Sequence, residues 1–365
     1  MSKNLYSGIV PTDFYVEYKK ENTSNERKGE IEEEVFRLIR GVNKFPENDV
    51  DLEMEVQQLR GLARLDLGKF YNNGVIKPNN LGQTLCYKYY PNIWDIIRIR
   101  VGTRPISMRE AFFSDIDLKR AIRLNLTYDA GVEGLRSWFR LFDIGYGMNF
   151  RPSSAKIIYE TNLSEGAKVL DYSAGYGGRL LGAWSSEKVV EYVGIEPNTE
   201  TYENALGFEK FLNGKHGNQL RVRMLKSGSE DVTVERFPEY REYFDMAFSS
   251  PPYFNLEKYS DEGTQAYAKF PEYKAWVKGY LRPTVHNCID MLKRDGIFAM
   301  NIYEDETYGK VKGIKQVIEF ICGEKDYQLY KIDRMEVNIR PGNGERDKKD
   351  RKTEPVFYFK HKDKV

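Results

Sequence analysis

The segment Asp171–Gly178 places an acid, small residues and glycines directly after a short apolar run. Gly175 and Gly177 let a backbone approach a ligand closely, and ligands of open α/β sheets bind beyond the carboxyl ends of the strands. Glu196 ends the next apolar run, at roughly the 20-residue spacing where a carboxylate accepts hydrogen bonds from ribose hydroxyls. The pattern favours a nucleotide-like ligand, and a tight turn in an ordinary α/β domain is the alternative for the glycines alone.

A second segment, Ser250-Pro251-Pro252-Tyr253, follows the apolar run 244–248. The prolines remove two backbone donors and stiffen the chain, but their carbonyls remain as acceptors. Ser250 Oγ and the Pro251 carbonyl would accept the two hydrogens of a planar amino group while Tyr253 stacks on its ring. Group transfer to that nitrogen would depend on position and electrostatics more than on a strong base. A structural Pro-Pro turn is the alternative for this segment alone.

The elements that must position these segments alternate in type after about residue 150. We expect strands at Ala167–Tyr172, Val189–Ile195, Leu220–Leu225, Phe244–Phe248, Gly296–Ile302, Tyr327–Ile339 and Pro355–Lys360. We expect helices from Gly178 and over Asn198–Leu212, Tyr273–Leu292 and Lys310–Cys322. This alternation predicts a mostly parallel sheet covered on both faces. The last two strands, joined without a helix, predict an antiparallel edge.

The first 150 residues have a different, mostly helical pattern. Apolar residues at three- and four-residue spacing predict helices over Ile31–Arg40, Asp51–Asp66, Ser107–Leu126 and Asp129–Phe142. Polar and glycine-rich stretches predict loops at Lys19–Glu30 and Asn72–Gly82. We therefore predict a mostly helical region over residues 1–147 and a catalytic domain over residues 148–365.

Composition narrows the class of protein. The 365 residues carry 56 Lys and Arg against 55 Asp and Glu, a net charge of +1, which excludes a polybasic tail protein but not a local basic cleft. Three distant cysteines and three histidines form neither a disulfide framework nor a metal pattern. The absence of a long apolar run or a signal-like start predicts a soluble, cytoplasmic protein with no membrane partner. The 26 tyrosines are best explained as half-buried packing.

Taken together, the glycine segment, Glu196 and the proline segment resemble class I methyltransferases that use S-adenosylmethionine (AdoMet). Among these, Ser250-Pro251-Pro252-Tyr253 is similar to the Asp/Asn/Ser-Pro-Pro-Tyr/Phe/Trp motif of DNA amino-methyltransferases. The resemblance covers about residues 148–361. It implies an α/β, Rossmann-like seven-stranded domain with AdoMet as cofactor, preceded here by a mostly helical extension.

The resemblance also implies roles for single residues. Asp171 would lie near the methionine amino group, Glu196 at the ribose, and Ser229 or Glu230 at the adenine amino group, although a helix cap explains the last pair nearly as well. The segment 150–154 resembles the one that closes over the methionine end. The implied cofactor-binding residues are Phe150, Asp171, Ser173, Ala174, Gly175, Gly177, Glu196, Pro197, Ser229, Glu230 and Ser249. The implied catalytic residues are Ser250, Pro251, Pro252 and Tyr253.

The serine form of the motif is typical of enzymes that methylate cytosine N4. We therefore predict methyl transfer to an exocyclic amino group of a DNA base, most simply cytosine N4. N6-adenine methylation, RNA base methylation and a catalytically silent AdoMet-fold module that binds nucleic acid stay as alternatives. The aspartate form of the motif is more typical of N6-adenine enzymes, and the asparagine form is shared with enzymes that methylate protein glutamine.

The DNA partner would present its base flipped out of a duplex or in a single strand. Tyr253, Phe254 and Tyr259 would form an aromatic wall for that base, with ordinary packing as the alternative for the last two. The loop 340–352 has a local excess of positive charge that would suit phosphates, or it is a solvated hairpin tip. Target recognition, if any, is expected from residues 1–150, 255–270 or 341–352. The sequence does not determine the oligomeric state.

Overall fold

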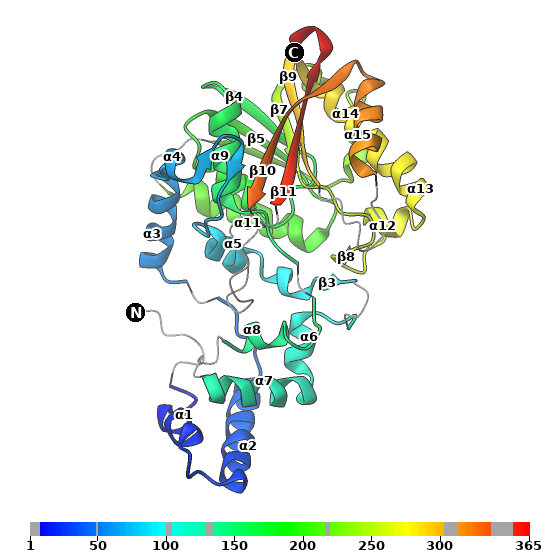
Figure 1. Cartoon of the computed structure of the whole chain (residues 1–365). Coiled ribbons are helices and arrows are strands. Elements are labelled where there is room, and N and C mark those ends of the chain that lie inside the picture. Colours follow the sequence, from blue (N-terminus) through cyan, green and yellow to red (C-terminus); the bar gives the residue numbers. More distant parts are fainter. Residues whose placement is uncertain are drawn as a thin grey trace. The chain divides into compact units, whose positions relative to one another are not determined.

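The computed structural model describes residues 8–48, 50–99, 104–128, 134–145, 147–215, 220–302, 313–336 and 353–365. The chain forms two compact units (Figure 1). The first unit comprises Met1–Glu55, Pro91–Met148 and Leu256–Ser260. The second comprises Val56–Tyr90, Asn149–Asn255 and Asp261–Val365. Over the described residues, no helix has the length and apolar character needed to cross a membrane.

The second unit is built on a nine-stranded sheet in the order β1-β2-β10-β11-β9-β7-β4-β5-β6. Its seven principal strands are β4 (Ala167–Asp171), β5 (Val189–Ile195), β6 (Arg221–Leu225), β7 (Phe244–Ser249), β9 (Leu292–Asn301), β10 (Tyr327–Glu336) and β11 (Thr353–His361). β4, β5, β6, β7 and β9 run parallel, and β11 is antiparallel to both β9 and β10. The predicted α/β, Rossmann-like methyltransferase fold and its antiparallel edge are confirmed.

Register brings the ends of neighbouring strands to one edge of the sheet. Asp171, the last residue of β4, pairs with Gly194 of β5, and Ile195 pairs with Leu225 of β6. Ser249, the last residue of β7, pairs with Met300 of β9. The loops that follow β4, β5, β6 and β7 therefore leave the sheet together, which is where ligands bind in open α/β sheets.

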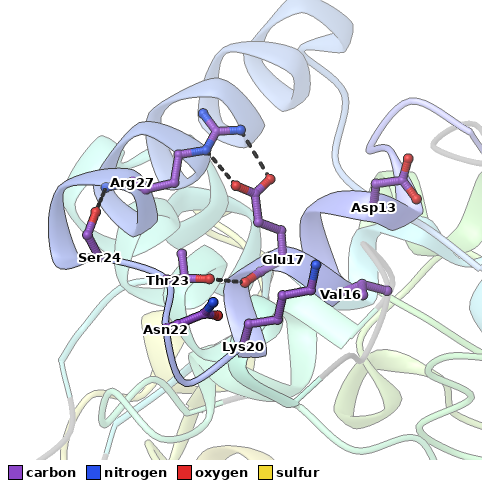
Figure 2. A pocket seen from close by; sticks show the side chains of 8 residues that line it. All are labelled: Asp13, Val16, Glu17, Lys20, Asn22, Thr23, Ser24 and Arg27. Carbon is purple, nitrogen blue, oxygen red and sulfur yellow. Dashed lines mark hydrogen bonds and ion pairs between the residues drawn. The ribbon is translucent and has the colours of Figure 1, made fainter.

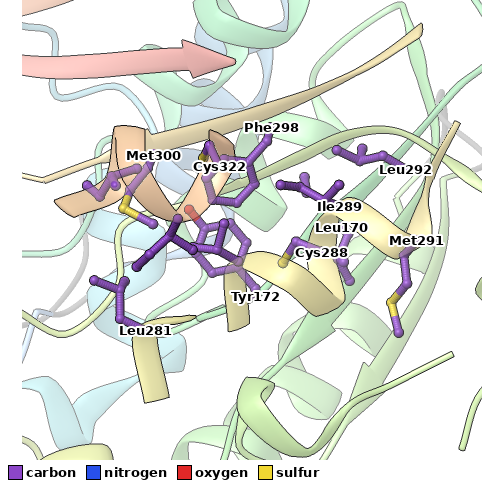
Figure 3. Close-up of a cluster of buried hydrophobic side chains, with 14 of the residues drawn as sticks. Leu170, Tyr172, Leu281, Cys288, Ile289, Met291, Leu292, Phe298, Met300 and Cys322 are labelled. Carbon is purple, nitrogen blue, oxygen red and sulfur yellow. The ribbon is translucent and has the colours of Figure 1, made fainter. Parts of the chain in front are cut away.

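Helices cover both faces of this sheet. They are α9 (Pro152–Asn162), α10 (Gly178–Trp184), α11 (Thr199–Asn213), α13 (Tyr273–Trp276), a π-helical turn η5 (Val277–Leu281), α14 (Arg282–Met291) and α15 (Ile314–Gly323), with the short η3 (Ser229–Asp231) after β6. Side chains of α14 and α15, among them Cys288 and Cys322, pack with Tyr172 and Phe298 of the sheet region in one buried cluster (Figure 3). Successive residues of a strand point to opposite faces of the sheet. Phe248 of β7 points away from this cluster, and its ring packs edge-on against that of Tyr159 of α9.

The predicted helix over 273–292 is interrupted. A π-turn separates α13 from α14, and Pro283 follows at the second position of α14. Proline has no N–H to donate to the preceding turn, so a wider turn upstream relieves the mismatch. The strand β9 also begins at Leu292, four residues before the predicted start. The predicted start of the helix 310–322 and the predicted end of the strand 327–339 lie outside the described residues.

A hairpin joins the sheet at a place predicted to be a loop. β1 (Tyr71–Asn72) and β2 (Val75–Ile76) are linked by Asn73 and Gly74, both with positive φ. Asn-Gly with two positive φ angles is the favoured two-residue hairpin turn, so the sequence did carry this signal. β2 then pairs in parallel with β10, and the sheet has nine strands where seven were predicted.

Residues 56–90 fold with the second unit, which corrects the predicted single boundary at residue 148. The helix α3 (Leu52–Ala63) ends where the buried Lys156 ammonium of α9 donates to the carbonyls of Leu62 and Ala63, at 3.1 and 2.6 Å. A cation is favourable at the carboxyl end of a helix dipole. The Ser153 hydroxyl also donates to the carbonyl of Asn79. These contacts attach the segment to α9.

The first unit is helical, as predicted, with several changes of boundary. Its helices are α1 (Thr12–Lys19), α2 (Asn25–Val42), α6 (Met108–Phe113), α7 (Asp115–Tyr128) and α8 (Leu135–Phe139). The predicted loop 19–30 is wrong beyond Ser24, whose hydroxyl accepts from the Arg27 N–H and begins α2. The predicted helix 107–126 is broken at Ser114, which has an extended backbone. Residues 256–260 join this unit because β8 (Glu257–Lys258) pairs with β3 (Ile97–Arg98).

Candidate active site

The Asp171 carboxylate at the end of β4 is the centre of a buried hydrogen-bond network. Its Oδ2 accepts from Arg179 Nε at 2.8 Å and from the Tyr192 hydroxyl at 2.5 Å. Its Oδ1 accepts from the Ser249 hydroxyl at 2.7 Å and from the Ser173 N–H at 3.3 Å. Asp171 and Ser249 have no exposed surface. Both hold the glycine loop from inside the fold, and their role as direct contacts of a cofactor stays a prediction.

Arg179, the second residue of α10, is the counter-ion of Asp171. Its guanidinium also donates to the Ser173 carbonyl and lies 5.3 Å from the ring centroid of Phe150. Burial is the largest single influence and lowers the pKa of Arg179, but the charge and the hydrogen bond of Asp171, together with Tyr192 and Tyr159, raise that pKa on balance. A buried charge is tolerated only when it is paired and hydrogen-bonded. The pair therefore stabilises the start of α10 and the loop before it.

The glycine loop has the backbone geometry that the sequence predicts. Gly175 and Gly177 have φ of +57° and +75°, in the left-handed region that favours glycine. The Gly175 N–H donates to Glu196 Oε2 at 3.0 Å, and Glu196 Oε1 accepts from the Asn198 N–H at 2.9 Å. A Cβ added at Gly175 would meet only the Ser173 carbonyl, at 3.8 Å. The loop thus exposes an open backbone surface beside a fixed carboxylate.

Glu196 is only 8% exposed, and its charge state follows from that burial. Burial raises the pKa of Glu196 from 4.5 to about 7, while the two backbone N–H bonds from Asn198 and Gly175 partly oppose the rise. Each carboxylate oxygen accepts more than one hydrogen bond, so both keep acceptor capacity. Two neighbouring hydroxyls, as in a ribose, would bind to the ionised form and favour it.

The loop after β6 holds a carboxylate with one unpaired oxygen. Glu230 Oε1 accepts from Lys269 Nζ at 2.5 Å, whereas the buried Oε2 has no hydrogen-bond partner. Leaving a buried acceptor unsatisfied is costly, and an amino group of a ligand would satisfy it. Ser229, by contrast, is 5% exposed and its hydroxyl lies 2.9 Å from that of Thr284. Glu230 is therefore the better candidate of the predicted pair.

Tyr280 connects the loops that follow β4 and β6. Its hydroxyl lies 3.2 Å from Ser173 Oγ, and it also hydrogen-bonds to the Ser229 side chain. The residue is 3% exposed, and burial raises the pKa of its phenol well above the usual range. Tyr280 lies in the π-helical turn, a distortion that often accompanies functional sites. The turn sets the position of a hydroxyl that both loops share.

The Ser250-Pro251-Pro252-Tyr253 motif forms a tight turn directly after β7. Pro251 is buried, whereas Ser250, Pro252 and Tyr253 are partly exposed. The Pro252 carbonyl accepts from the Phe254 N–H at 2.9 Å, which closes a three-residue turn. Ser250 Oγ lies 3.4 Å from the Tyr253 hydroxyl. The Pro252 carbonyl thus has a partner within the turn, and the acceptor roles of Ser250 Oγ and the Pro251 carbonyl stay a prediction.

The aromatic residues after the motif divide between two roles. Phe254 has a φ of +53°, which is strained for a bulky side chain. It is 6% exposed, and its ring packs edge-on against Tyr273 and Trp276, at centroid distances of 5.6 and 5.8 Å. For Phe254 the packing alternative is therefore confirmed. Tyr259 belongs to the first unit, where its hydroxyl donates to Glu257 at 2.7 Å, and its place in a base-binding wall stays a prediction.

The other predicted cofactor residues surround the same loops. The Phe150 ring packs edge-on against Phe248 at 5.5 Å. The Ala174 N–H donates to the carbonyl of Ile195 at 2.9 Å, which ties the glycine loop to the end of β5. Pro197 is partly exposed next to Glu196. The basic loop predicted to contact phosphates, 340–352, lies outside the described residues.

Sequence reasoning missed several residues of the site, namely Arg179, Tyr192, Lys269 and Tyr280. Arg179 did carry a signal, because a cation in the first turn of a helix opposes the dipole and needs an anionic partner. The others carried none that we recognise. Tyr280 and its partner Ser173 are 107 positions apart, and only tertiary packing brings them together.

The first unit also has a hollow on its surface. It lies between α1 and α2 and is lined by polar side chains (Figure 2). Arg27 Nε donates to Glu17 at 2.7 Å, and the Thr23 hydroxyl donates to the Glu17 carbonyl, so these charges are already paired. No residue of the predicted site lines it. Within the described part of the chain, no group of three His, Cys, Asp or Glu side chains is placed to hold a metal ion.

Comparisons with known proteins give structural neighbours only. No protein-family model and no curated protein matches the chain. Solved structures that match include SAM-dependent methyltransferases from Methanosarcina mazei, at 14% identity and a TM-score of 0.36 over 55% of this chain and 95% of that chain. A proposed rRNA methylase from Clostridium thermocellum matches at 13% identity and 0.37, over 59% and 98%. A didemethyltoxoflavin N1-methyltransferase from Burkholderia thailandensis, with bound S-adenosylhomocysteine, matches at 12% identity and 0.37, over 57% and 77%.

Proposed function

We propose that this chain is an AdoMet-dependent methyltransferase that modifies the exocyclic amino group of a nucleic-acid base, with cytosine N4 in DNA as the first choice. The observation that carries the proposal is the turn Ser250–Tyr253 at the end of β7, on the sheet edge that also holds the glycine loop. Ser249 donates to the Asp171 carboxylate, so the catalytic turn and the glycine loop are joined by adjacent residues.

The loops fit an adenosine-containing donor. Glu196 offers both carboxylate oxygens beside the open surface of Gly175, and Glu230 offers an unpaired acceptor after β6. A ribose diol and an adenine amino group carry hydrogen-bond donors, and the oxygens of these two carboxylates would accept from them. AdoMet, when bound, supplies an electrophilic methyl group on a sulfonium.

The proline turn would orient the acceptor amine. Ser250 Oγ and the Pro251 carbonyl would accept the two amine hydrogens, which directs the nitrogen lone pair toward the donor. Tyr253 would stack on the base, and the stiff prolines keep the acceptors in place without reorganisation. Alignment of the two reactants supplies much of the rate acceleration in such a transfer. The amine loses its proton readily once it is methylated, so no strong base is needed.

The proposal is tested with isotopically labelled AdoMet and a panel of duplex DNA, single-stranded DNA and RNA. Digestion to nucleosides and mass spectrometry identify the product. N4-methylcytosine supports the proposal as stated, and N6-methyladenine moves it to the related DNA chemistry. Label found in RNA alone replaces the DNA substrate by RNA. No label on any nucleic acid, with donor binding intact, refutes a nucleic-acid substrate.

Matched variants separate catalysis from folding. Tyr253→Ala and Pro252→Ala should abolish transfer and leave S-adenosylhomocysteine binding nearly unchanged, because both residues are predicted to act on the acceptor base and not on the donor. Phe254→Leu is the control within the same turn, because the Phe254 ring packs into the core. Equal loss of transfer and of binding in Tyr253→Ala would mean that the tyrosine is structural.

A further inference from the structure

The residue that follows the proline turn (Ser250–Tyr253) has a strained backbone. Phe254 has a φ of +53°, in the left-handed region that bulky side chains rarely adopt. Glycine adopts this conformation readily, and asparagine does so more easily than an aromatic residue. Strained residues persist only where the surrounding structure holds them, and they cluster at active sites and ligand clamps. A phenylalanine at this position therefore needs an explanation in terms of its side chain.

The proline turn is fastened to the second unit at both of its ends. At its start, the Ser249 hydroxyl donates to the Asp171 carboxylate at 2.7 Å. At its end, the Phe254 side chain is buried, whereas Asn255 is only partly so. The chain then passes to the first unit, which contains residues 256–260. Phe254 is thus the last buried side chain that can hold the turn before the chain leaves the second unit.

The Phe254 ring packs on a helical segment that also contacts the glycine loop. Its neighbours are the rings of Tyr273 and Trp276, both of α13, which it meets edge-on. Trp276 has no exposed surface, and its ring centroid lies 5.6 Å from that of Tyr280 in the π-helical turn. The Tyr280 hydroxyl lies 3.2 Å from Ser173 Oγ. One segment of the second unit therefore supports the acceptor turn at one end and the donor loop at the other.

We propose that Phe254 and Trp276 are positioning residues, which fix the place of the proline turn relative to the donor loop. The inference rests on the proposed function. The left-handed backbone at residue 254 directs this ring into the core while the preceding ring, Tyr253, stays partly exposed for the acceptor base. Transfer in line with the donor methyl group depends on alignment, and a misplacement of about 1 Å can cost about 100-fold in rate. Anchorage of the ring explains why the strain is tolerated.

Three substitutions at residue 254 separate anchorage from backbone conformation. Phe254→Gly adopts the same φ without strain but has no ring, Phe254→Ala has neither advantage, and Phe254→Leu keeps an apolar anchor. Methyl transfer is measured at saturating AdoMet on whichever of duplex DNA, single-stranded DNA or RNA the wild-type chain modifies. We expect kcat to fall about 100-fold in Phe254→Gly and Phe254→Ala. It should stay within about threefold of wild type in Phe254→Leu, because conservative apolar exchanges are tolerated best.

Binding of the donor product supplies a readout that should not change. S-adenosylhomocysteine should bind within about twofold of wild type in all three variants, because perturbations at separate sites couple only weakly. Trp276→Leu is an independent variant that should lower kcat as well. Combined with Phe254→Ala, it should lower kcat no further, because the two residues act through one contact.

Phe359→Ala controls for the loss of stability that follows removal of a buried ring. Phe359 of β11 has no exposed surface and packs against Phe298 of β9. Both alanine variants should unfold at lower temperature, because each leaves a cavity in the core. Rates are compared at a temperature where thermal melts show every variant to be folded. Only Phe254→Ala should then have a lower kcat.

The outcomes distinguish this inference from the proposed function. If the wild-type chain transfers methyl groups and Phe254→Gly keeps the wild-type kcat, the ring is structural and the inference is wrong, while the proposed function stands. An equal fall of kcat in Phe359→Ala would also overturn it, because general loosening of the core would explain the loss. If the wild-type chain modifies no nucleic acid, the proposed function is wrong and the positioning role is refuted with it. Loss of kcat in the glycine and alanine variants alone supports both.

Discussion

The charge state of Glu196 should control the affinity for the donor. Its pKa is about 7 in the ligand-free chain, because burial outweighs two backbone hydrogen bonds. Ribose hydroxyls donate to the ionised carboxylate, so binding selects that form. The apparent affinity should therefore follow the ionised fraction, which is about one in eleven at pH 6 and about ten in eleven at pH 8. S-adenosylhomocysteine should bind about tenfold more weakly at pH 6, about 1.4 kcal/mol.

Isothermal titration calorimetry between pH 6 and pH 8 measures this effect directly. Titrations near pH 7 in buffers of different ionisation enthalpy should also show release of about half a proton per ligand bound, because about half of Glu196 is protonated there. Glu196→Gln keeps the size of the side chain and cannot ionise, so its affinity should be lower at pH 8 and flat with pH. A flat wild-type curve, or an equal slope in Glu196→Gln, would refute the reasoning.

Three further predictions concern the residues behind the loop. Arg179→Met leaves the Asp171 carboxylate buried without its counter-ion and should lower the free energy of unfolding by about 3–5 kcal/mol. In a double-mutant cycle measured by denaturant unfolding, adding Asp171→Asn should recover part of this loss. Strictly additive losses would disprove the pairing. Gly175→Ala and Gly177→Ala should each cost about 1–2 kcal/mol of stability because of the positive φ at these positions. Gly177→Ala should lower the melting temperature more, because only its added Cβ meets the Tyr90 ring. Ser249→Ala should lower the free energy of unfolding by about 1.5–3 kcal/mol through the lost hydrogen bond to Asp171. Ser250→Ala should lower kcat and leave the free energy of unfolding unchanged. The opposite result for the two variants would show that the roles of these adjacent serines are exchanged.

Local features of the sequence were sufficient to predict the strands and to locate the two motifs. The positive φ of Gly175 and Gly177 could be predicted because few other residues adopt it, and the parallel strands could be predicted from short apolar runs followed by turns. Asn73-Gly74 carried an equally local hairpin signal that was overlooked. Boundaries such as the break at Ser114 were missed because apolar spacing continues across them.

The sequence by itself determined that an acid, two glycines and a proline turn follow buried strands, because backbone conformation there depends on residue type alone. Only the tertiary structure decided which side chains remain available to a ligand. Asp171 and Ser249 are predicted ligand contacts from the sequence, and only the structure shows that Arg179, Tyr192 and a mutual hydrogen bond hold them in place. Gln83 looks like part of a separate extension, yet packing of α5 (Gln83–Tyr89) in the second unit brings its side chain to the Asn149 carbonyl. Pairing across a fold depends on where distant segments meet, and no local pattern records that.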